Sequence, residues 1–441
     1  MNRSPQNKRR RNPRRTFFAV LLYGIATILC IAILFGLVLL VKKIGVSVSL
    51  DDEKAPTDTV VPADGEKTPE TSQPTEPEPI PEPTYRHATF AAAGDILVHT
   101  NVYKYAAQLA QGTDKEYDFK PIFANIKEII SSADAAYVNQ ETICGGKDLG
   151  GYSGYPMFNT PDEIAEAVVD TGFDIVNIAN NHMLDKGERG LSRAIDFWNE
   201  QPVTLIGGFK DKEDYENIRI YEVNGIKIAF LAYTYWTNGL TLPSSSPLVV
   251  PYDDHDEVDR QTKAAREIAD IVMVSMHWGD EDNFTPNEDQ TELAAIMAKN
   301  NVDVVLGMHP HVLQKIERIP RSDGKEMLCA YSLGNLISTM MYSRNMLGGI
   351  LRFEINEDEN GFSIDNAELI PTMVHYSAGF SSPTIYLFKD YTQEMQSTHG
   401  SRRYDNPPKD IDYLNGILTK YIPKEYIKEP SLQALYDGAA A

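Results

Sequence analysis

The chain has 441 residues, of which 42% are hydrophobic and 24% charged, a composition typical of a globular protein that can bury a large core. Its formal net charge is −22, but residues 1–43 carry nine basic and no acidic side chains, so the remainder holds 32 basic against 63 acidic groups, a net of −31. Such an acidic body excludes nucleic acid as the main partner, because it repels a phosphate backbone. The three cysteines have no CxxC spacing, and we expect neither a zinc site built on them nor a structural disulfide.

An uncharged apolar run occupies residues 16–41, directly after a basic tail at residues 1–15. The run has 26 residues, whereas a helix needs about 20 to cross a bilayer and a cleaved signal peptide has an apolar region of about 7–15. This length favours an uncleaved transmembrane helix over a signal peptide or a buried core helix. Seven basic residues precede the run and two follow it, so the positive-inside rule places the N-terminus in the cytoplasm. We therefore expect a single-pass protein of the cell membrane with an extracellular main domain.

Residues 44–84 have the composition of a linker. Within them, residues 51–84 contain eight prolines and ten acidic residues and almost no large apolar side chain. Such a segment cannot bury a core, and proline and like charges keep it extended, so we predict a disordered spacer. The pattern changes at Tyr85, and we expect a folded domain at 85–388 followed by a C-terminal tail at 389–441 of unknown role.

Strand-like and helix-like segments alternate along this domain. Short apolar runs typical of strands occur at residues 87–95, 135–141, 173–182, 271–280 and 302–311. Helical patterns occur at residues 121–130, 161–172, 189–201, 255–269 and 288–301, with Pro161 expected in a first turn and Gly172 just past a helix end. Hairpins are predicted at residues 218–233, 311–335 and 348–371, and residues 410–422 favour a short helix in the tail. The alternation predicts the α/β class, with one mixed sheet or two sheets.

Polar side chains follow five of the predicted strands at the point where each strand ends. They are Asp95 and His99, Asn139 and Glu141, Asn180, Asn181, His182 and Asp185, His277, and finally His309 and His311. Ligands of open α/β sheets bind at the carboxyl ends of strands, and converging carboxylates, amides and imidazoles suit a metal ion. The sequence therefore predicts a clustered polar site at one rim of the sheet.

Each of these signals has a plainer interpretation when taken singly. A histidine at a strand end can be a satisfied loop residue, and Asn-Asn is a common turn signal. The pair His309 and His311 is stronger, because residues two apart point the same way along an extended chain. Cys144 could act as a nucleophile only with a base close by, and the absence of GxSxG argues against a serine hydrolase elbow.

Six motifs occur in a recognisable order: AAGDILVH, VNQET, GFDIVNIANNHMLDKGERGL, HWGDE, GMHPHVLQ and YSLGNLI. Over about residues 87–340 the chain resembles the CapA-type capsule-synthesis (poly-γ-glutamate biosynthesis) family, which is in turn similar to calcineurin-like metallophosphoesterases. The resemblance implies a metallophosphoesterase-like four-layer α/β/β/α sandwich. It also implies a role in making or exporting poly-γ-glutamate, with the polymer and membrane subunits of capsule synthesis as partners.

The resemblance implies a role for each matching residue. One or two divalent transition-metal ions (Mn, Zn or Fe) would be held by Asp95, Glu141, Asn181, His277, His309 and His311. His182 and Asp185 would be catalytic, with the imidazole acting on the phosphate side, and His99, Asn139 and Asn335 would support the ligands. Three features depart from the phosphoesterase pattern: His99 lies four residues after Asp95, the second motif ends in glutamate, and Met183 rather than an acid follows His182.

Two kinds of function fit this pattern. The first is a metal-dependent hydrolase or transferase acting outside the membrane. The alternative is a non-catalytic accessory or scaffold that binds polymer, although an acidic body repels a polyanion. The basic residues Lys186, Arg189, Arg193 and Arg344 could offset that repulsion, or they could be ordinary solvated side chains.

Overall fold

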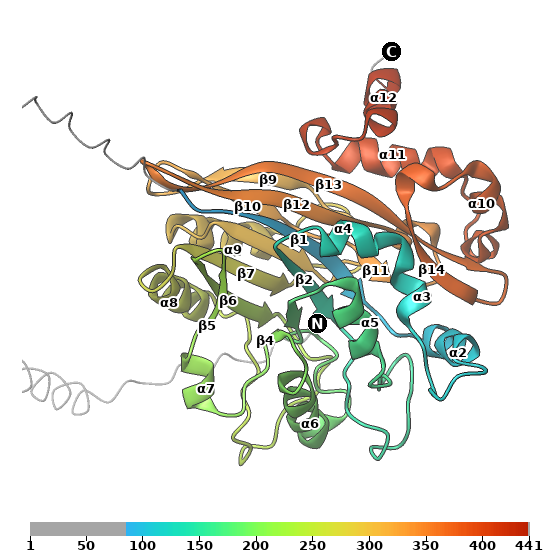
Figure 1. Cartoon of the computed structure of the whole chain (residues 1–441), viewed down its shortest axis with the longest axis horizontal. Helices are drawn as coiled ribbons and strands as arrows, with labels where there is room; N and C mark the ends of the chain where they lie inside the picture. Colours follow the sequence, from blue (N-terminus) through green and yellow to red (C-terminus); the bar gives the residue numbers. More distant parts are fainter. Residues whose placement is uncertain (1–84, 440–441) are drawn as a thin grey trace, which may run out of the picture. The chain divides into compact units, whose positions relative to one another are not determined.

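The computed structural model describes residues 85–439, so the predicted transmembrane helix at 16–41 and the linker at 44–84 lie outside the described residues. Within residues 85–439, no helix is both long and apolar enough to cross a membrane. Two β-sheets make up the centre of this part of the chain (Figure 1).

The first sheet has eight strands in the order β14-β13-β12-β1-β2-β3-β4, with β11 pairing beside the end of β1. Strands β1 to β4 run parallel, and β12, β13 and β14 add to them in antiparallel fashion. The strands are β1 (His87–Ile96), β2 (Ala135–Gln140), β3 (Ile175–Asn177), β4 (Thr204–Ile206), β11 (Asn335–Ile337), β12 (Leu347–Asp358), β13 (Gly361–Ser377) and β14 (Ser381–Leu387).

The second sheet has six strands in the order β5-β6-β7-β8-β10-β9. Its central strands are parallel, and its two outer strands belong to the predicted hairpins β5–β6 and β9–β10. The strands are β5 (Arg219–Val223), β6 (Ile226–Thr234), β7 (Ile271–His277), β8 (Val304–Met308), β9 (Ile316–Pro320) and β10 (Glu326–Ala330). The α/β class with mixed sheets is therefore confirmed.

Helices complete the described part of the chain. They are α2 (Thr100–Leu109), α3 (Lys120–Phe123), α4 (Lys127–Ser131), α5 (Ile164–Thr171), α6 (Gly187–Asn199), α7 (Lys212–Glu216), α8 (His255–Arg266), α9 (Glu288–Lys299), α10 (Gln393–Thr398), α11 (Ile411–Tyr421) and α12 (Pro430–Ala439). Short 3-10 helices occupy Ala124–Ile126, Ser343–Asn345, Phe388–Asp390, Gly400–Arg403 and Lys424–Tyr426.

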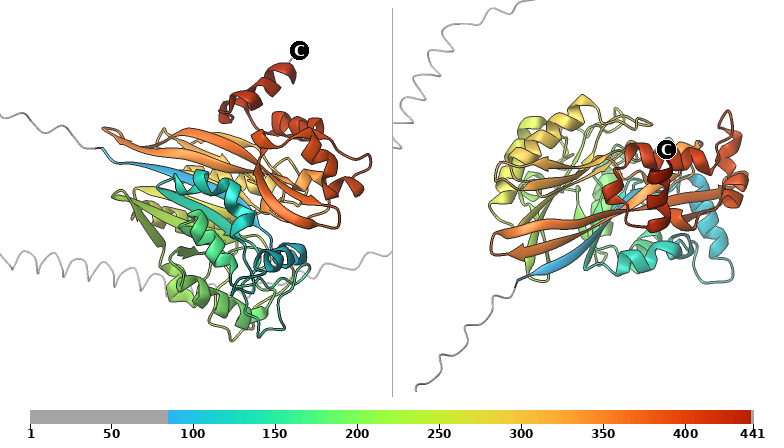
Figure 2. Two further views of the ribbon diagram at one scale, coloured as in Figure 1. Left: turned by 45° about the vertical axis from the view of Figure 1, so that its right-hand side comes forward. Right: turned by 90° about the horizontal axis from the view of Figure 1, so that it is seen from above.

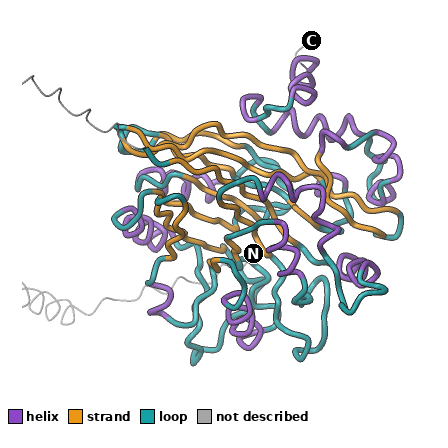
Figure 3. The backbone as a smooth tube through the Cα atoms, in the orientation of Figure 1, coloured by secondary structure: helices purple, strands orange, loops and turns teal. Residues whose placement is uncertain are grey.

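The two sheets pack face to face, with helices on their outer faces. The side chains of β6 point alternately to its two faces. Ile228, Phe230 and Ala232 belong to the core between the sheets. The intervening residues Ala229 and Leu231 join a second core with α8 and α9. Across the interface, the Phe90 ring on β1 lies 6.2 Å from the Phe230 ring, measured between centroids. Figure 2 shows the resulting order of helices, sheet, sheet and helices when the molecule is seen from above, and Figure 3 shows how loops gather at one end of the strands.

Two helix predictions need correction. The segment at 121–130 is broken into α3, a 3-10 turn and α4 rather than forming one helix. Helix α5 begins at Ile164, so Pro161 precedes the helix and does not lie in its first turn. Gly172 ends α5 as expected, with a φ of 101° that the absence of a Cβ permits.

Candidate metal centre

The carboxyl ends of β1, β2 and β3 from one sheet meet those of β7 and β8 from the other. Pairing register brings Asp95 beside Asn139, and Asn139 beside Asn177. His277 ends β7, in register with Met308 at the end of β8. The predicted rim is therefore built by two sheets, and the polar side chains lie between them.

Two buried amide side chains in a row fix the carboxylate of Asp95. Asn139 Nδ2 donates to Asp95 Oδ1 at 2.7 Å, and Asn177 Nδ2 donates to Asn139 Oδ1 at 2.9 Å. The backbone N–H of His309 donates to the other Asp95 oxygen at 3.2 Å. Asn139 thus fixes one oxygen of the Asp95 carboxylate. Asn177 was not predicted, because only its register beside Asn139 reveals its part.

Glu141 lies at the centre of the cluster and is completely buried. Its carboxylate lies 3.8 Å from Nε2 of His277 and 3.7 Å from Nε2 of His311. Neither of its oxygens has a hydrogen-bond partner among residues 85–439. Burial raises the pKa of Glu141 well above its ordinary value, opposed by the charge of His311. A buried carboxylate without hydrogen-bond partners is costly, so this arrangement suits a carboxylate that binds a cation.

The donor atoms fit divalent metal ions. Glu141, His277 and His309 place one donor each within 4.8 Å of one another, and so do Asp95, Glu141 and His311. The two sets share Glu141, which could therefore bridge two ions. Nδ1 of His309 is a further buried atom without a partner in the described part of the chain. Mixed carboxylate and imidazole donors suit Mn, Fe or Zn rather than Mg or Ca.

His309 and His311 converge for a different reason from the one predicted. Their φ angles are 97° and 57°, so the chain turns sharply here and is not extended. The two rings lie 5.7 Å apart between centroids, and His309 also lies 4.8 Å from His277. Because positive φ is uncommon for residues with a side chain, this conformation marks a strained turn.

Amide oxygens lie close to a ring nitrogen of two of the histidines. Asn181 Oδ1 lies 3.0 Å from Nε2 of His277, and Asn335 Oδ1 lies 3.0 Å from Nδ1 of His311. Burial lowers the pKa of His311, but the facing carboxylates of Glu141 and Asp95 outweigh burial and raise that pKa to about 10. Burial lowers the pKa of His277 and His309 well below the ordinary value, which keeps both imidazoles neutral and able to bind metal.

His182 and Asp185 form a close pair beside this centre. Nδ1 of His182 lies 2.8 Å from Oδ2 of Asp185, which also accepts the backbone N–H of Phe158 at 2.7 Å. The Phe158 ring packs edge-on against the imidazole, with centroids 4.7 Å apart. The acid three residues after His182 thus orients the imidazole through Nδ1, and within residues 85–439 no hydrogen bond engages Nε2.

Two other candidates from the sequence, His99 and Cys144, are not among the grouped donor atoms. His99 Nδ1 accepts the backbone N–H of Thr339 at 3.3 Å, and burial lowers the pKa of His99 to about 4. Cys144 is buried, and burial raises the pKa of its thiol well above the ordinary value. A thiol held protonated in this way does not suit a nucleophile.

Sequence reasoning did not single out Glu281. Its carboxylate falls within 4.8 Å of donor atoms of His309 and His311, although its side chain is exposed. The one signal in the sequence was its place in the motif HWGDE, four residues after His277.

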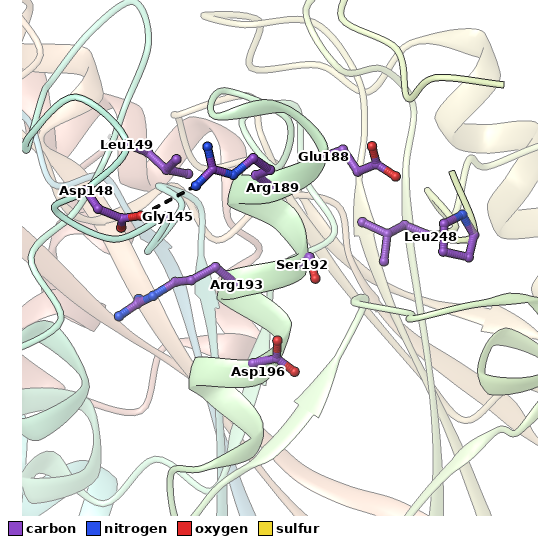
Figure 4. A pocket seen from close by; sticks show the side chains of 10 residues that line it. Gly145, Asp148, Leu149, Glu188, Arg189, Ser192, Arg193, Asp196 and Leu248 are labelled. Carbon is purple, nitrogen blue, oxygen red and sulfur yellow. Dashed lines mark ion pairs between the residues drawn. The ribbon is translucent and has the colours of Figure 1, made fainter. Parts of the chain in front are cut away.

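A surface groove of about 480 Å³ lies beside α6 (Figure 4). Its basic residues face acids: Arg189 lies 3.7 Å from Asp148, and Arg193 donates to Asp162 at 2.6 Å. Arg344, elsewhere in the chain, pairs with Asp282. Two of the four basic residues that could have attracted a polyanion, Arg193 and Arg344, thus form close, partly buried ion pairs, whereas the contact between Arg189 and Asp148 is exposed.

The family model described as bacterial capsule synthesis protein PGA_cap matches residues 89–340. The chain belongs to this family. All six predicted metal ligands and the pair His182 and Asp185 fall within the matched PGA_cap region.

Two relatives within the family are similar over most of the domain. The chain is 27% identical over 297 residues to the PGA biosynthesis protein CapA of Bacillus subtilis, a match that covers 66% of this chain and 73% of that protein. It is 27% identical over 284 residues to the capsule biosynthesis protein CapA of Bacillus anthracis, covering 63% of this chain and 65% of that protein.

Solved structures match more weakly. A calcineurin-like phosphoesterase, YfkN of Bacillus subtilis, is 12% identical and has a TM-score of 0.38, covering 76% of this chain and 99% of that one. A novel phosphatase from Mycoplasma pneumoniae is 13% identical and has a TM-score of 0.40, covering 65% and 94%. The family assignment rests on the sequence match and not on these scores.

Proposed function

We propose that this member of the PGA_cap family is a membrane-anchored extracellular protein of capsule or poly-γ-glutamate synthesis or export, and that its site is a metal-dependent phosphoester hydrolase. The similarity to a PGA biosynthesis protein and a capsule biosynthesis protein of two Bacillus species supports the role in synthesis. The basic tail followed by 26 uncharged residues supports an anchor with a cytoplasmic N-terminus.

The observation that carries the catalytic proposal is the buried Glu141 carboxylate, which has no hydrogen-bond partner among the described residues and is shared by two potential ligand sets. Asp95, Glu141, Asn181, His277, His309 and His311 would hold one or two divalent ions. Such ions lower the pKa of a bound water and offset charge on phosphoryl oxygens.

His182 and Asp185 would supply the protein's own part of the chemistry. Asp185 accepts a hydrogen bond from Nδ1–H of His182 and stabilises the imidazolium form, whose Nε2–H could donate its proton to the leaving oxygen or a hydrogen bond to a phosphoryl oxygen. An accessory that only binds polymer would hold its metal without this pair. The close ion pairs of Arg193 and Arg344 with acids also reduce the free positive charge that a polyanion could contact.

The test combines metal content with hydrolysis by the full-length protein. We expect one or two equivalents of a transition metal in the wild type and their loss in the double variant His309→Ala, His311→Ala. His182→Ala should retain the metal but lower kcat on a chromogenic phosphoester panel about 10²–10⁴-fold, the usual contribution of general acid catalysis. His255→Ala, an exposed histidine paired with Asp289, is the matched control and should change neither quantity.

Three results would contradict the proposal. A wild type that holds no metal even after incubation with manganese or zinc rules out the hydrolase. Full activity of His182→Ala removes that residue from the reaction. Bound metal with no hydrolysis of any phosphoester supports the polymer-binding accessory instead.

A further inference from the structure

The loop after β7 carries an exposed carboxylate to the edge of the buried centre. Glu281 can offer an oxygen within 4.8 Å of donor atoms of both His309 and His311. The other carboxylates of the centre, Asp95 and Glu141, are fully buried. A free glutamate side chain would lose rotamer entropy on binding an ion, so a stable ligand at the surface requires a fixed backbone.

The next residue, Asp282, fixes that backbone on two sides. Its N–H donates to the carbonyl of Pro310, between the two histidines, at 2.9 Å. Its side chain accepts from Arg344 through both oxygens, at 2.9 and 2.8 Å, and from Asn345 Nδ2 at 2.6 Å. Asp282 has a φ of 63°, so these contacts hold a backbone conformation that the residue rarely adopts by itself.

The segment that carries Arg344 is anchored in turn by the C-terminal part of the chain. Ser343 Oγ donates to Asp405 Oδ2 at 2.6 Å and lies 2.8 Å from Ser401 Oγ. Asn345 Nδ2 also reaches the carbonyl of His311 at 3.4 Å. A continuous set of polar contacts thus runs from residues 401–405 to the histidine turn.

We propose that Glu281 is a further metal ligand on the solvent side of the centre, and that the ion pair between Asp282 and Arg344 is the positioning element that holds it there. The inference rests on the metal centre of the proposed function. Neither Asp282 nor Arg344 contacts the ion; both act through the conformation of the loop. A bidentate guanidinium–carboxylate pair suits this task because it fixes direction as well as distance.

The experiment measures the dissociation constant of Mn²⁺ for the full-length protein. Glu281→Gln, which keeps the shape of the side chain, should weaken binding of at least one ion about tenfold or more. In Asp282→Asn the new side chain still tolerates a positive φ. This variant should weaken Mn²⁺ binding about tenfold, the usual effect of losing a residue that supports a ligand. Arg344→Gln is a second variant of the same pair, in case Asp282→Asn disturbs folding. Arg219→Gln, which breaks a similarly buried ion pair with Asp214, is the control and should leave the constant unchanged.

A double-mutant cycle separates positioning from general damage. If Asp282 acts through Glu281, the variant with both substitutions should bind Mn²⁺ no more weakly than Glu281→Gln alone, within twofold. Additive losses would overturn the role of the ion pair. If the wild type binds Mn²⁺ and Glu281→Gln binds it equally well, Glu281 is not a metal ligand. Failure of the wild type itself to bind metal would instead overturn the proposed function.

Discussion

Burial and mutual charge set the protonation of individual side chains in the metal centre. The pKa of His311 is raised to about 10 because Glu141 and Asp95 face it, and burial raises the pKa of Glu141. Without metal, the Glu141–His311 pair therefore retains a proton in the folded state to a higher pH than in the unfolded state. A metal ion must displace this proton, so metal binding should tighten as the pH rises.

This protonation predicts how the metal-free protein responds to pH. The stability that His311 contributes is fully present below its unfolded pKa of 6.5 and is lost as the pH rises through about 10. Urea unfolding in the presence of a chelator should show the free energy of unfolding falling between pH 6.5 and 9.5, by on the order of 1.4 kcal/mol per unit of raised pKa. His311→Gln should flatten this fall. Equal slopes for both proteins would show that His311 is not held as a cation.

At the scale of elements, glycines let strand ends approach the turn that carries Asn335. A Cβ at Gly94, directly before Asp95 in β1, would lie 1.9 Å from the carbonyl oxygen of Gly334, and one at Gly307 in β8 would lie 2.0 Å from that of Tyr331. Backbone atoms cannot give way as a flexible side chain can. The position of Asp95 therefore depends on this close contact between neighbouring elements.

Gly94→Ala should consequently destabilise the protein by about 1–3 kcal/mol, the usual cost of overpacking, and should weaken Mn²⁺ binding by moving Asp95. Urea unfolding and metal titration measure the two effects. Gly416→Ala in α11 is the matched control, because a Cβ there meets nothing within 4 Å. It should stabilise the helix by about 0.5–1 kcal/mol. If Gly94→Ala leaves both the free energy of unfolding and Mn²⁺ binding unchanged, the close contact with Gly334 does not position Asp95.

At the scale of the whole molecule, the residues after β14 share the core of the first sheet. Phe388, Leu414, Ile417, Leu418 and Ile427 are buried in the same cluster as the strands. Figure 1 shows α10, α11 and α12 following β14 at one side of this sheet. Burial of each large apolar side chain stabilises a protein by about 1.5–3 kcal/mol, so this segment contributes to folding.

A chain ending at residue 387 should therefore be poorly soluble or unfolded, since the lost burial is comparable to the whole stability of a domain. A chain shortened only by residues 438–441 is the control and should melt close to the wild type. Soluble yield and thermal melting distinguish the two chains. A stable, metal-binding protein ending at residue 387 would show that the C-terminal segment is dispensable.

Much of the candidate site was predictable because local sequence patterns identify the strands and the polar residues that follow them. Apolar runs ending in Asp95, Glu141 and His277 identify strands and the polar residues at their ends, and Asn224-Gly225 and Asn360-Gly361 identify hairpins. Strand ends of a parallel sheet meet at one edge, so the gathering of these side chains within each sheet follows from the alternation of strands and helices. The sequence by itself thus determined the class of fold, most of the candidate ligands and the family.

Only the tertiary structure decided how those residues meet. Asn177 acquires its role from register with a neighbouring strand, and Glu281 reaches the histidines because Asp282 is bound to a segment about sixty residues later in the chain. The left-handed turn at His309 and His311 depends on contacts from Asp95 in the other sheet. Local patterns encode strands and their ends, whereas register, ion pairs and backbone conformation at the site are set by free energies of contacts between distant segments.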